Sequence, residues 1–134
     1  MAECLREKLE IDATHIDEYG HVNYKSHPLL LERFQDLYME RVVGLSFPEI
    51  QKRFGLLSIV RAMNVNYSGQ LCKGDVVDVN TKITRVGDTS FTLSQEILKD
   101  NTMLTSLDMV VVMCDEVTRD KSTIPEELRK RLSK

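Results

Sequence analysis

The 134-residue sequence has the composition of an ordinary globular domain, with 42% hydrophobic and 29% charged residues. Its formal net charge is -3, and its basic residues do not gather with aromatic ones as a nucleic-acid groove requires, so we expect no nucleic-acid partner. The charged start contains no apolar run that would serve as a signal peptide or membrane anchor. We therefore expect a cytoplasmic protein that does not bind membranes, and three cysteines without a Cys-x-x-Cys pair fit that reducing compartment.

The first half of the chain predicts one strand, one polar loop and one long helix. Residues 5–13 alternate between apolar and charged side chains, the period of a half-buried strand. A loop follows over residues 15–23. Apolar residues then recur at steps of three and four over residues 30–45, which predicts an amphipathic helix that ends near Gly44.

The second half predicts mainly strands. Pro48 and Gly55 bracket a short turn in which a helix is an option. Period-two alternation then predicts four strands joined by hairpin turns, over residues 57–67, 77–83, 91–97 and 103–113. Pro125 followed by two glutamates predicts the start of a short terminal helix.

This order of elements predicts an α+β fold in one domain, residues 1–134. One antiparallel sheet of about five strands buries a face by wrapping around the single long helix. The remaining surface and the sheet edges are best covered by a second copy of the chain, so we expect a homodimer or a homotetramer.

The densest group of chemically capable side chains lies in the loop between the first strand and the long helix. Asp17 stands shortly before the helix, where unpaired backbone N–H groups are able to hold a developing oxyanion while a carboxylate attacks or activates water. Thioester hydrolysis needs these two parts and no metal. Spacing alone also allows Asp17 merely to cap a turn.

Residues 17–23, Asp-Glu-Tyr-Gly-His-Val-Asn, resemble the Asp-x-x-Gly-His-Val-Asn signature of the hotdog-fold thioesterases of the 4-hydroxybenzoyl-CoA thioesterase family. The resemblance extends to an acidic residue on the following helix, here Glu32, to the turn at residues 71–75 and to the closing segment at residues 124–128. It spans nearly the whole chain in the order of elements, and its specific letters are those of residues 17–23.

The resemblance implies a hotdog fold and the hydrolysis of an acyl-CoA or acyl-carrier-protein thioester, without a cofactor other than the CoA of the substrate. Asp17 would be the nucleophile or general base, and Tyr24 would offer its backbone N–H to the carbonyl oxygen. Gly20 would let the loop approach the substrate. His21 and Asn23 would shape the turn or position the substrate, in a pocket that draws on both chains of a dimer.

One departure from the family pattern concerns the start of the long helix. Many members carry Tyr ten residues after the Asp, whereas this chain has His27 followed by Pro28. Proline is excluded from a helix interior, so we expect regular helix from Pro28, with Ser26 or His27 as its cap. This puts the direction of the Tyr24 N–H in question and leaves His27 as a candidate for substrate binding.

Glu32 is the alternative catalytic carboxylate, because another branch of hotdog thioesterases places its acid on the central helix. Glu32, Asp36 and Glu40 follow one another at four-residue steps, which is also the layout of a solvated acidic face. We therefore rank Glu32 below Asp17.

The remaining alternatives are a metal site and two other functions. The three histidines stand six residues apart, a spacing that points them to different sides, so we expect no metal. An enoyl or hydroxyacyl thioester hydratase or dehydratase would pair His21 or His27 with Glu32 as base and acid. A non-catalytic acyl-thioester-binding or regulatory domain also stays open, because a fold does not fix a function.

Overall fold

The structure is a computed structural model that describes residues 3–12, 16, 22 and 26–133. Its elements follow the predicted order: β1 (Leu5–Glu10), α1 (Ser26–Tyr38), the π-helical turn η2 (Met39–Val43), α2 (Phe47–Phe54), β2 (Leu56–Tyr67), β3 (Val76–Val86), β4 (Ser90–Lys99), β5 (Thr102–Asp115) and α3 (Glu126–Leu132). Strand β1 ends earlier than predicted, at Glu10. Ile11 is nevertheless buried, and its N–H donates to the Asp75 carbonyl at 2.9 Å.

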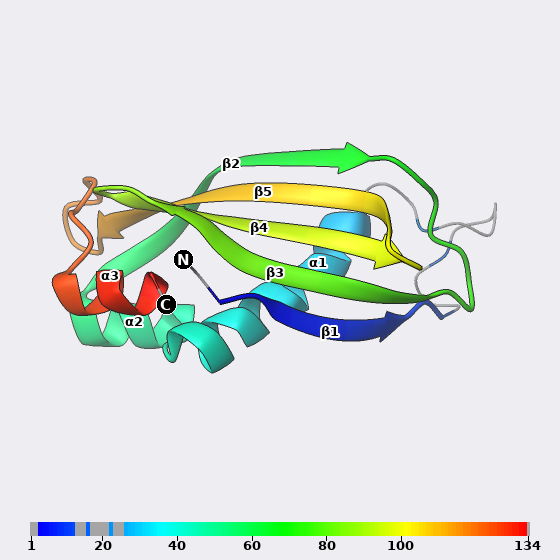
Figure 1. Ribbon diagram of the computed structural model, residues 1–134. Helices are drawn as coiled ribbons and strands as arrows, with labels where there is room; N and C mark the ends of the chain where they lie inside the picture. Colours follow the sequence, from blue (N-terminus) through cyan, green and yellow to red (C-terminus); the bar gives the residue numbers. More distant parts are fainter. Residues whose placement is uncertain (1–2, 13–15, 17–21, 23–25, 134) are drawn as a thin grey trace.

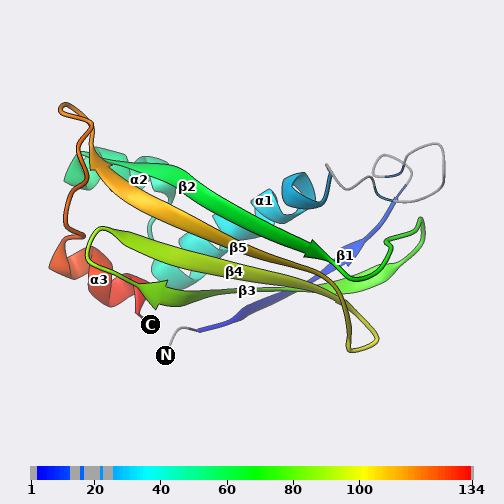
Figure 2. The ribbon, with the colours of Figure 1, turned by 90° about the horizontal axis from the view of Figure 1, so that it is seen from above.

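The strands form one antiparallel sheet in the order β1-β3-β4-β5-β2. Helix α1 crosses behind this twisted sheet (Figure 1), and Figure 2 shows the same arrangement from above. The predicted α+β architecture is thus confirmed, and β1 and β2 are the two edges of the sheet.

Helix α1 holds the centre of the core. Leu31, Phe34 and Tyr38 are each at most 1% exposed and follow the spacing of one helix face. They pack in the same cluster as inward side chains of the sheet such as Val79 and Leu93. Burying each large apolar side chain stabilises the fold by roughly 1.5–3 kcal/mol, so this face fixes α1 on the sheet.

The long helix begins and ends close to where the sequence predicts. It starts at Ser26, so Pro28 lies in the first turn, where a missing N–H is tolerated. The last turn widens to a π-helix, which was not predicted, and Gly44 then ends it with a φ of +84°. A side chain at this glycine would also meet the Arg131 guanidinium, whose Nη1 lies 2.8 Å from the Cβ position. Both the backbone angle and the neighbour therefore favour glycine.

The short helix that the sequence allowed between Pro48 and Gly55 is present as α2. Ser46 caps it, because the Ser46 hydroxyl accepts from the Glu49 N–H at 3.2 Å and the Glu49 carboxylate accepts from the Ser46 N–H at 3.0 Å. This reciprocal pair is the capping box, and its Ser-x-x-Glu spacing was visible in the sequence.

Strand β2 is an edge with unusual apolar exposure. Ile59, Val60, Met63 and Tyr67 are 46%, 51%, 44% and 44% exposed. A bulge between Val60 and Ala62 interrupts the pairing of β2 with β5. The alternating pattern predicted a strand with one buried apolar side, whereas in the single chain many apolar side chains of β2 are exposed to solvent.

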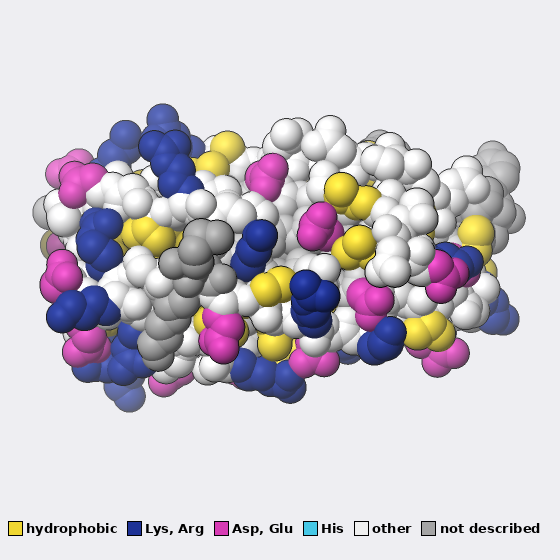
Figure 3. Space-filling view, viewed as in Figure 1, with side chains coloured by type: hydrophobic (Ala, Val, Ile, Leu, Met, Phe, Trp, Pro, Cys, Tyr) yellow, Lys and Arg dark blue, Asp and Glu magenta, His cyan; other side chains and the backbone are white. Residues whose placement is uncertain are grey.

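The face of the molecule seen in Figure 1 carries basic and acidic side chains interspersed with apolar ones (Figure 3). No large field of one sign of charge forms on this face. Such a surface is ordinary for a protein whose net charge is small.

Replacing Tyr38 by Phe tests how the edge of β3 is closed just before β1 begins. The buried Tyr38 hydroxyl accepts from the Ile83 N–H at 3.2 Å and donates to the Glu3 carbonyl at 2.9 Å. Tyr38→Phe leaves both backbone groups without this partner, so we expect the free energy of unfolding to fall by about 1–3 kcal/mol in urea denaturation. An unchanged value would contradict this role of the hydroxyl.

Candidate active site

Most of the predicted site residues, in the family signature and just after it, lie outside the described residues. This concerns Asp17, Gly20, His21, Asn23 and Tyr24, so their predicted roles stay predictions. The described neighbours of this segment are well anchored: Ile16 and Val22 form an antiparallel bridge, and the Val22 N–H donates to the Leu71 carbonyl at 2.8 Å.

His27 is buried at the start of α1, with 3% of its surface exposed. Its Nδ1 lies 2.9 Å from the Thr105 hydroxyl on β5, and its ring meets Tyr67 at the end of β2 edge-on, with 4.9 Å between ring centroids. Burial lowers the pKa of His27, and a hydrogen bond to the Val22 backbone partly offsets this effect. His27 thus ties the start of α1 to the sheet as a neutral ring, while its predicted substrate contact stays a prediction.

Glu32 and Asp36 lie on the exposed side of α1, and the exposed Glu40 follows in η2, as the four-residue spacing predicted. Burial raises the pKa of Asp36, and the neighbouring charges of Glu32 and Glu40 raise it further. This helix face is therefore acidic and crowded with like charges. The alternative catalytic role of Glu32 stays a prediction.

A cavity of about 230 Å³ lies beside α1 on its β2 side. Its apolar lining residues are Phe47, Val60, Met109 and Val111. Its polar lining residues are Glu32, Gln35, Asp36 and Ser58. On the β1 side of the same helix, a larger cavity of about 420 Å³ is lined by charged residues such as Lys8 and Arg33 and by apolar residues such as Leu30.

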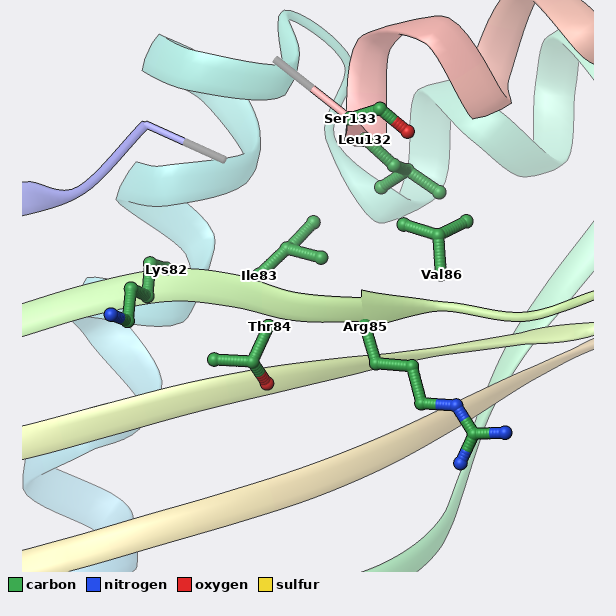
Figure 4. A pocket seen from close by; sticks show the side chains of 7 residues that line it. All are labelled: Lys82, Ile83, Thr84, Arg85, Val86, Leu132 and Ser133. Atoms are coloured by element: carbon green, nitrogen blue, oxygen red, sulfur yellow. The ribbon is translucent and has the colours of Figure 1, made fainter. Parts of the chain in front are cut away.

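A third cavity, of about 390 Å³, lies between the end of β3 and the end of α3 (Figure 4). Ile83 and Val86 point toward α3, whereas Thr84 and Arg85 point to the opposite side of the strand. A bulge between Ile83 and Arg85 interrupts the alternation of side chains along β3, so these two residues point to opposite sides of the strand. The lining of this cavity includes no residue of α1, so it is separate from the helix that follows the signature loop.

Within residues 3–12, 16, 22 and 26–133, no group of three or more His, Cys, Asp or Glu is placed to hold a metal ion. In the same part of the chain, no helix has the length and apolar character needed to cross a membrane.

The buried His27 predicts a pH dependence of stability. Because burial lowers its pKa below the ordinary value of 6.5, the unfolded chain takes up a proton before the native one does. We expect the free energy of unfolding to fall as the pH drops below about 6.5, and to level off once the native ring is protonated. His27→Gln removes this contribution, so urea denaturation between about pH 7.5 and pH 5.5 should show a weaker pH dependence in the variant. Equal pH dependence in both proteins would contradict this assignment.

Comparison with solved structures places the chain among hotdog folds. Slr0204 from Synechocystis, a 1,4-dihydroxy-2-naphthoyl-CoA thioesterase, superposes with a TM-score of 0.86 at 15% identity over 97% of this chain and 96% of that one. A predicted thioesterase from Bacillus stearothermophilus gives 0.78 at 26% identity over 97% and 94%. SAV2348 from Staphylococcus aureus, in complex with CoA, gives 0.86 at 16% identity over 98% and 83%. The predicted hotdog fold is confirmed.

Comparison with curated protein sequences gives no significant match. The family model of the thioesterase-like superfamily, in contrast, matches residues 11–132, nearly the whole chain. The prediction of a thioester hydrolase is confirmed at the level of this superfamily. With its fold and nearly its whole sequence matched, the chain belongs to the thioesterase-like superfamily.

Proposed function

We propose that this protein hydrolyses an acyl-CoA thioester with Asp17 as nucleophile or general base. The observation that supports the proposal is the arrangement of the described residues that flank the signature: Ile16 pairs with Val22, and the buried helix α1 begins at Ser26. The CoA bound to the neighbour SAV2348 supports CoA as the thiol part of the substrate. An acyl-carrier protein is the alternative thiol carrier.

The proposed reaction uses a carboxylate and backbone amides. Asp17 attacks the thioester carbonyl, or removes a proton from the water that attacks it. The Tyr24 N–H, near the positive end of α1, stabilises the oxyanion, and the carbonyl re-forms as the CoA thiolate leaves. As nucleophile, Asp17 first forms an acyl anhydride that water then hydrolyses. Both routes yield a free acid and a thiol, and CoA enters as part of the substrate.

The other residues of the signature serve the substrate in this proposal. Gly20 allows the loop backbone to come close to the thioester. His21, Asn23 and His27 position the substrate or shape the turn around it. Glu32 is the alternative acid on the helix.

We also propose that the active protein is a homodimer formed through β2, or a homotetramer of such dimers. An edge strand exposes unpaired N–H and C=O groups, and β2 adds exposed Ile59, Val60 and Met63. Antiparallel pairing of β2 with β2 of a second copy would give these backbone groups hydrogen-bond partners and cover the apolar side chains. It would also continue the sheet across a two-fold axis. We place this protein, a single domain over residues 1–134, in the cytoplasm.

Asp17→Asn tests the proposed chemistry. We expect wild-type protein to release CoA from at least one member of a panel of acyl-CoA esters, detected with a thiol-reactive dye. Loss of the carboxylate should lower kcat/KM by at least about a hundredfold, the scale for a central catalytic group. The matched control is Asp120→Asn, in an exposed turn beyond β5, which should leave the rate unchanged.

Each rival function has its own outcome in this assay. Release that survives in Asp17→Asn but disappears in Glu32→Gln would move the chemistry to the helix. Consumption of an enoyl ester without free thiol would identify a hydratase. Binding of the esters without any turnover would favour a regulatory domain.

Val60→Lys tests the dimer. In a β2–β2 contact the introduced lysine would lose its water and lie near the same lysine of the second copy. We therefore expect the variant to sediment as a monomer where the wild type sediments as a dimer. Val117→Lys, at an exposed turn position that is 83% accessible, is the matched control and should leave the assembly intact. A monomeric wild type would refute the proposed interface.

A further inference from the structure

The turn at residues 71–75, between β2 and β3, contacts the chain both before the signature and within it. Before the signature, the Ile11 N–H donates to the Asp75 carbonyl at 2.9 Å, and the Ile11 carbonyl accepts a second backbone hydrogen bond from the turn at 2.8 Å. Within the signature, the Val22 N–H donates to the Leu71 carbonyl at 2.8 Å. All three apolar residues in these contacts are buried. The turn lies at the end of the sheet where β1 ends (Figure 1), and there it joins two parts of the chain to each other.

Asp75 fixes the shape of this turn through both its side chain and its backbone. Its Oδ2 accepts from the Cys72 N–H at 2.8 Å, and its own N–H donates to the Cys72 carbonyl at 3.1 Å. Gly74 supplies a left-handed backbone angle in the turn, with a φ of +90°. Because a peptide unit is planar and trans, its C=O and N–H point in opposite directions. The Cys72 N–H shares a peptide unit with the Leu71 carbonyl, so the carboxylate that binds the N–H also directs this carbonyl toward Val22.

The Asp75 carboxylate is held in turn by Lys99, at the end of β4. The Lys99 Nζ lies 2.8 Å from the Asp75 Oδ1, so each carboxylate oxygen has its own donor. The hydrogen bond from Lys99, followed by that from the Cys72 N–H, lowers the pKa of Asp75, which therefore stays ionised in the neutral range. Hydrogen bonds to an ionised acceptor are stronger than those to a neutral one. Lys99 thus holds the acceptor that shapes the turn.

Val22 is held from a second side by the start of α1. The His27 ring makes a hydrogen bond to the Val22 backbone, and its Nδ1 lies 2.9 Å from the Thr105 hydroxyl on β5. Strands β4 and β5 pair as one hairpin, which carries both Lys99 and Thr105 close to its turn. This hairpin therefore reaches Val22 by two routes, one through Asp75 and one through His27.

We propose, on the basis of the proposed function, that Asp75 and Lys99 are positioning residues, which hold Val22 and thereby keep the signature in place for the reaction. Ile16, the residue before Asp17, pairs with Val22, so a displaced Val22 displaces the chain at the proposed catalytic carboxylate. A misplacement of about 1 Å can cost roughly a hundredfold in rate. Asp75 and Lys99 take no part in bond making and act through the turn alone.

The kinetic test compares this ion pair with a second ion pair of the same kind. With the acyl-CoA ester that the wild type hydrolyses best, we expect Asp75→Ala to lower kcat by about tenfold or more and to change KM by less than about threefold, because the geometry of attack is lost. Lys99→Met should lower kcat by about threefold or more, whereas Lys99→Arg, which keeps the charge, should stay within about twofold of the wild type. The control is Asp78→Ala, which removes the exposed Lys8–Asp78 pair between β1 and β3 and should leave kcat unchanged.

Amide hydrogen exchange, measured by NMR, follows Val22 without any substrate. In Asp75→Ala we expect the Val22 N–H to exchange at least about tenfold faster than in the wild type, while the N–H of Leu93, in the middle of β4, keeps its rate. Lys99→Met should change the exchange at Val22 in the same direction, and Lys99→Arg should restore it. If Asp75→Ala fails to fold, the two Lys99 variants decide the test, because the Lys99 side chain is 44% exposed and its replacement leaves the core intact.

The two measurements separate this inference from the proposed function. Absence of CoA release from every ester, with faster exchange at Val22 alone in Asp75→Ala, would overturn the proposed function and retain the role of Asp75 in holding Val22. CoA release with an unchanged kcat in Asp75→Ala, or a change in KM alone, would overturn the inference. Unchanged exchange at Val22, or equal acceleration at Val22 and Leu93, would overturn it as well, since the second result reports a general loss of stability.

Discussion

The burial of helix α1 against the sheet is the constraint on which the rest of this structure depends. Leu31, Phe34 and Tyr38 fix one face of the helix in the core, and Gln95 fixes its rotation by binding the Leu31 carbonyl. With the helix held in this way, its start has one place in the molecule, and so do the backbone amides at that start. A site that depends on helix-terminal N–H groups needs this rigidity, because an oxyanion is stabilised well only by donors that are already in position.

The single chain leaves one edge of its sheet uncovered. Apolar residues that an edge strand would normally hide are open along β2, and the cavity beside α1 borders the same edge. In the proposed dimer, closing that edge with a second copy would protect the strand and would also shield the cavity from water.

Much of the fold was predictable because its patterns are local. Period-two alternation located β3, β4 and β5, and three- and four-residue steps located α1. The sequence could not show that β2 lies at an edge, because strand order depends on pairing between distant segments, nor that the last turn of the long helix widens. Two polar residues on buried faces were readable signals that were not interpreted: Gln95 alternates with Leu93 and Ile97, and Gln35 directly follows Phe34. The roles predicted for Asp17 and Tyr24 rest on the family resemblance, since spacing alone favours a capped turn.

The most direct measurement of the central claim is a crystal structure of the protein with an acyl-CoA analogue in which a methylene group replaces the thioester sulfur. The account predicts the analogue carbonyl at the start of α1, with its carbon about 3–3.5 Å from an Asp17 carboxylate oxygen. An analogue seated elsewhere, with the Asp17 carboxylate turned into bulk water, would contradict it.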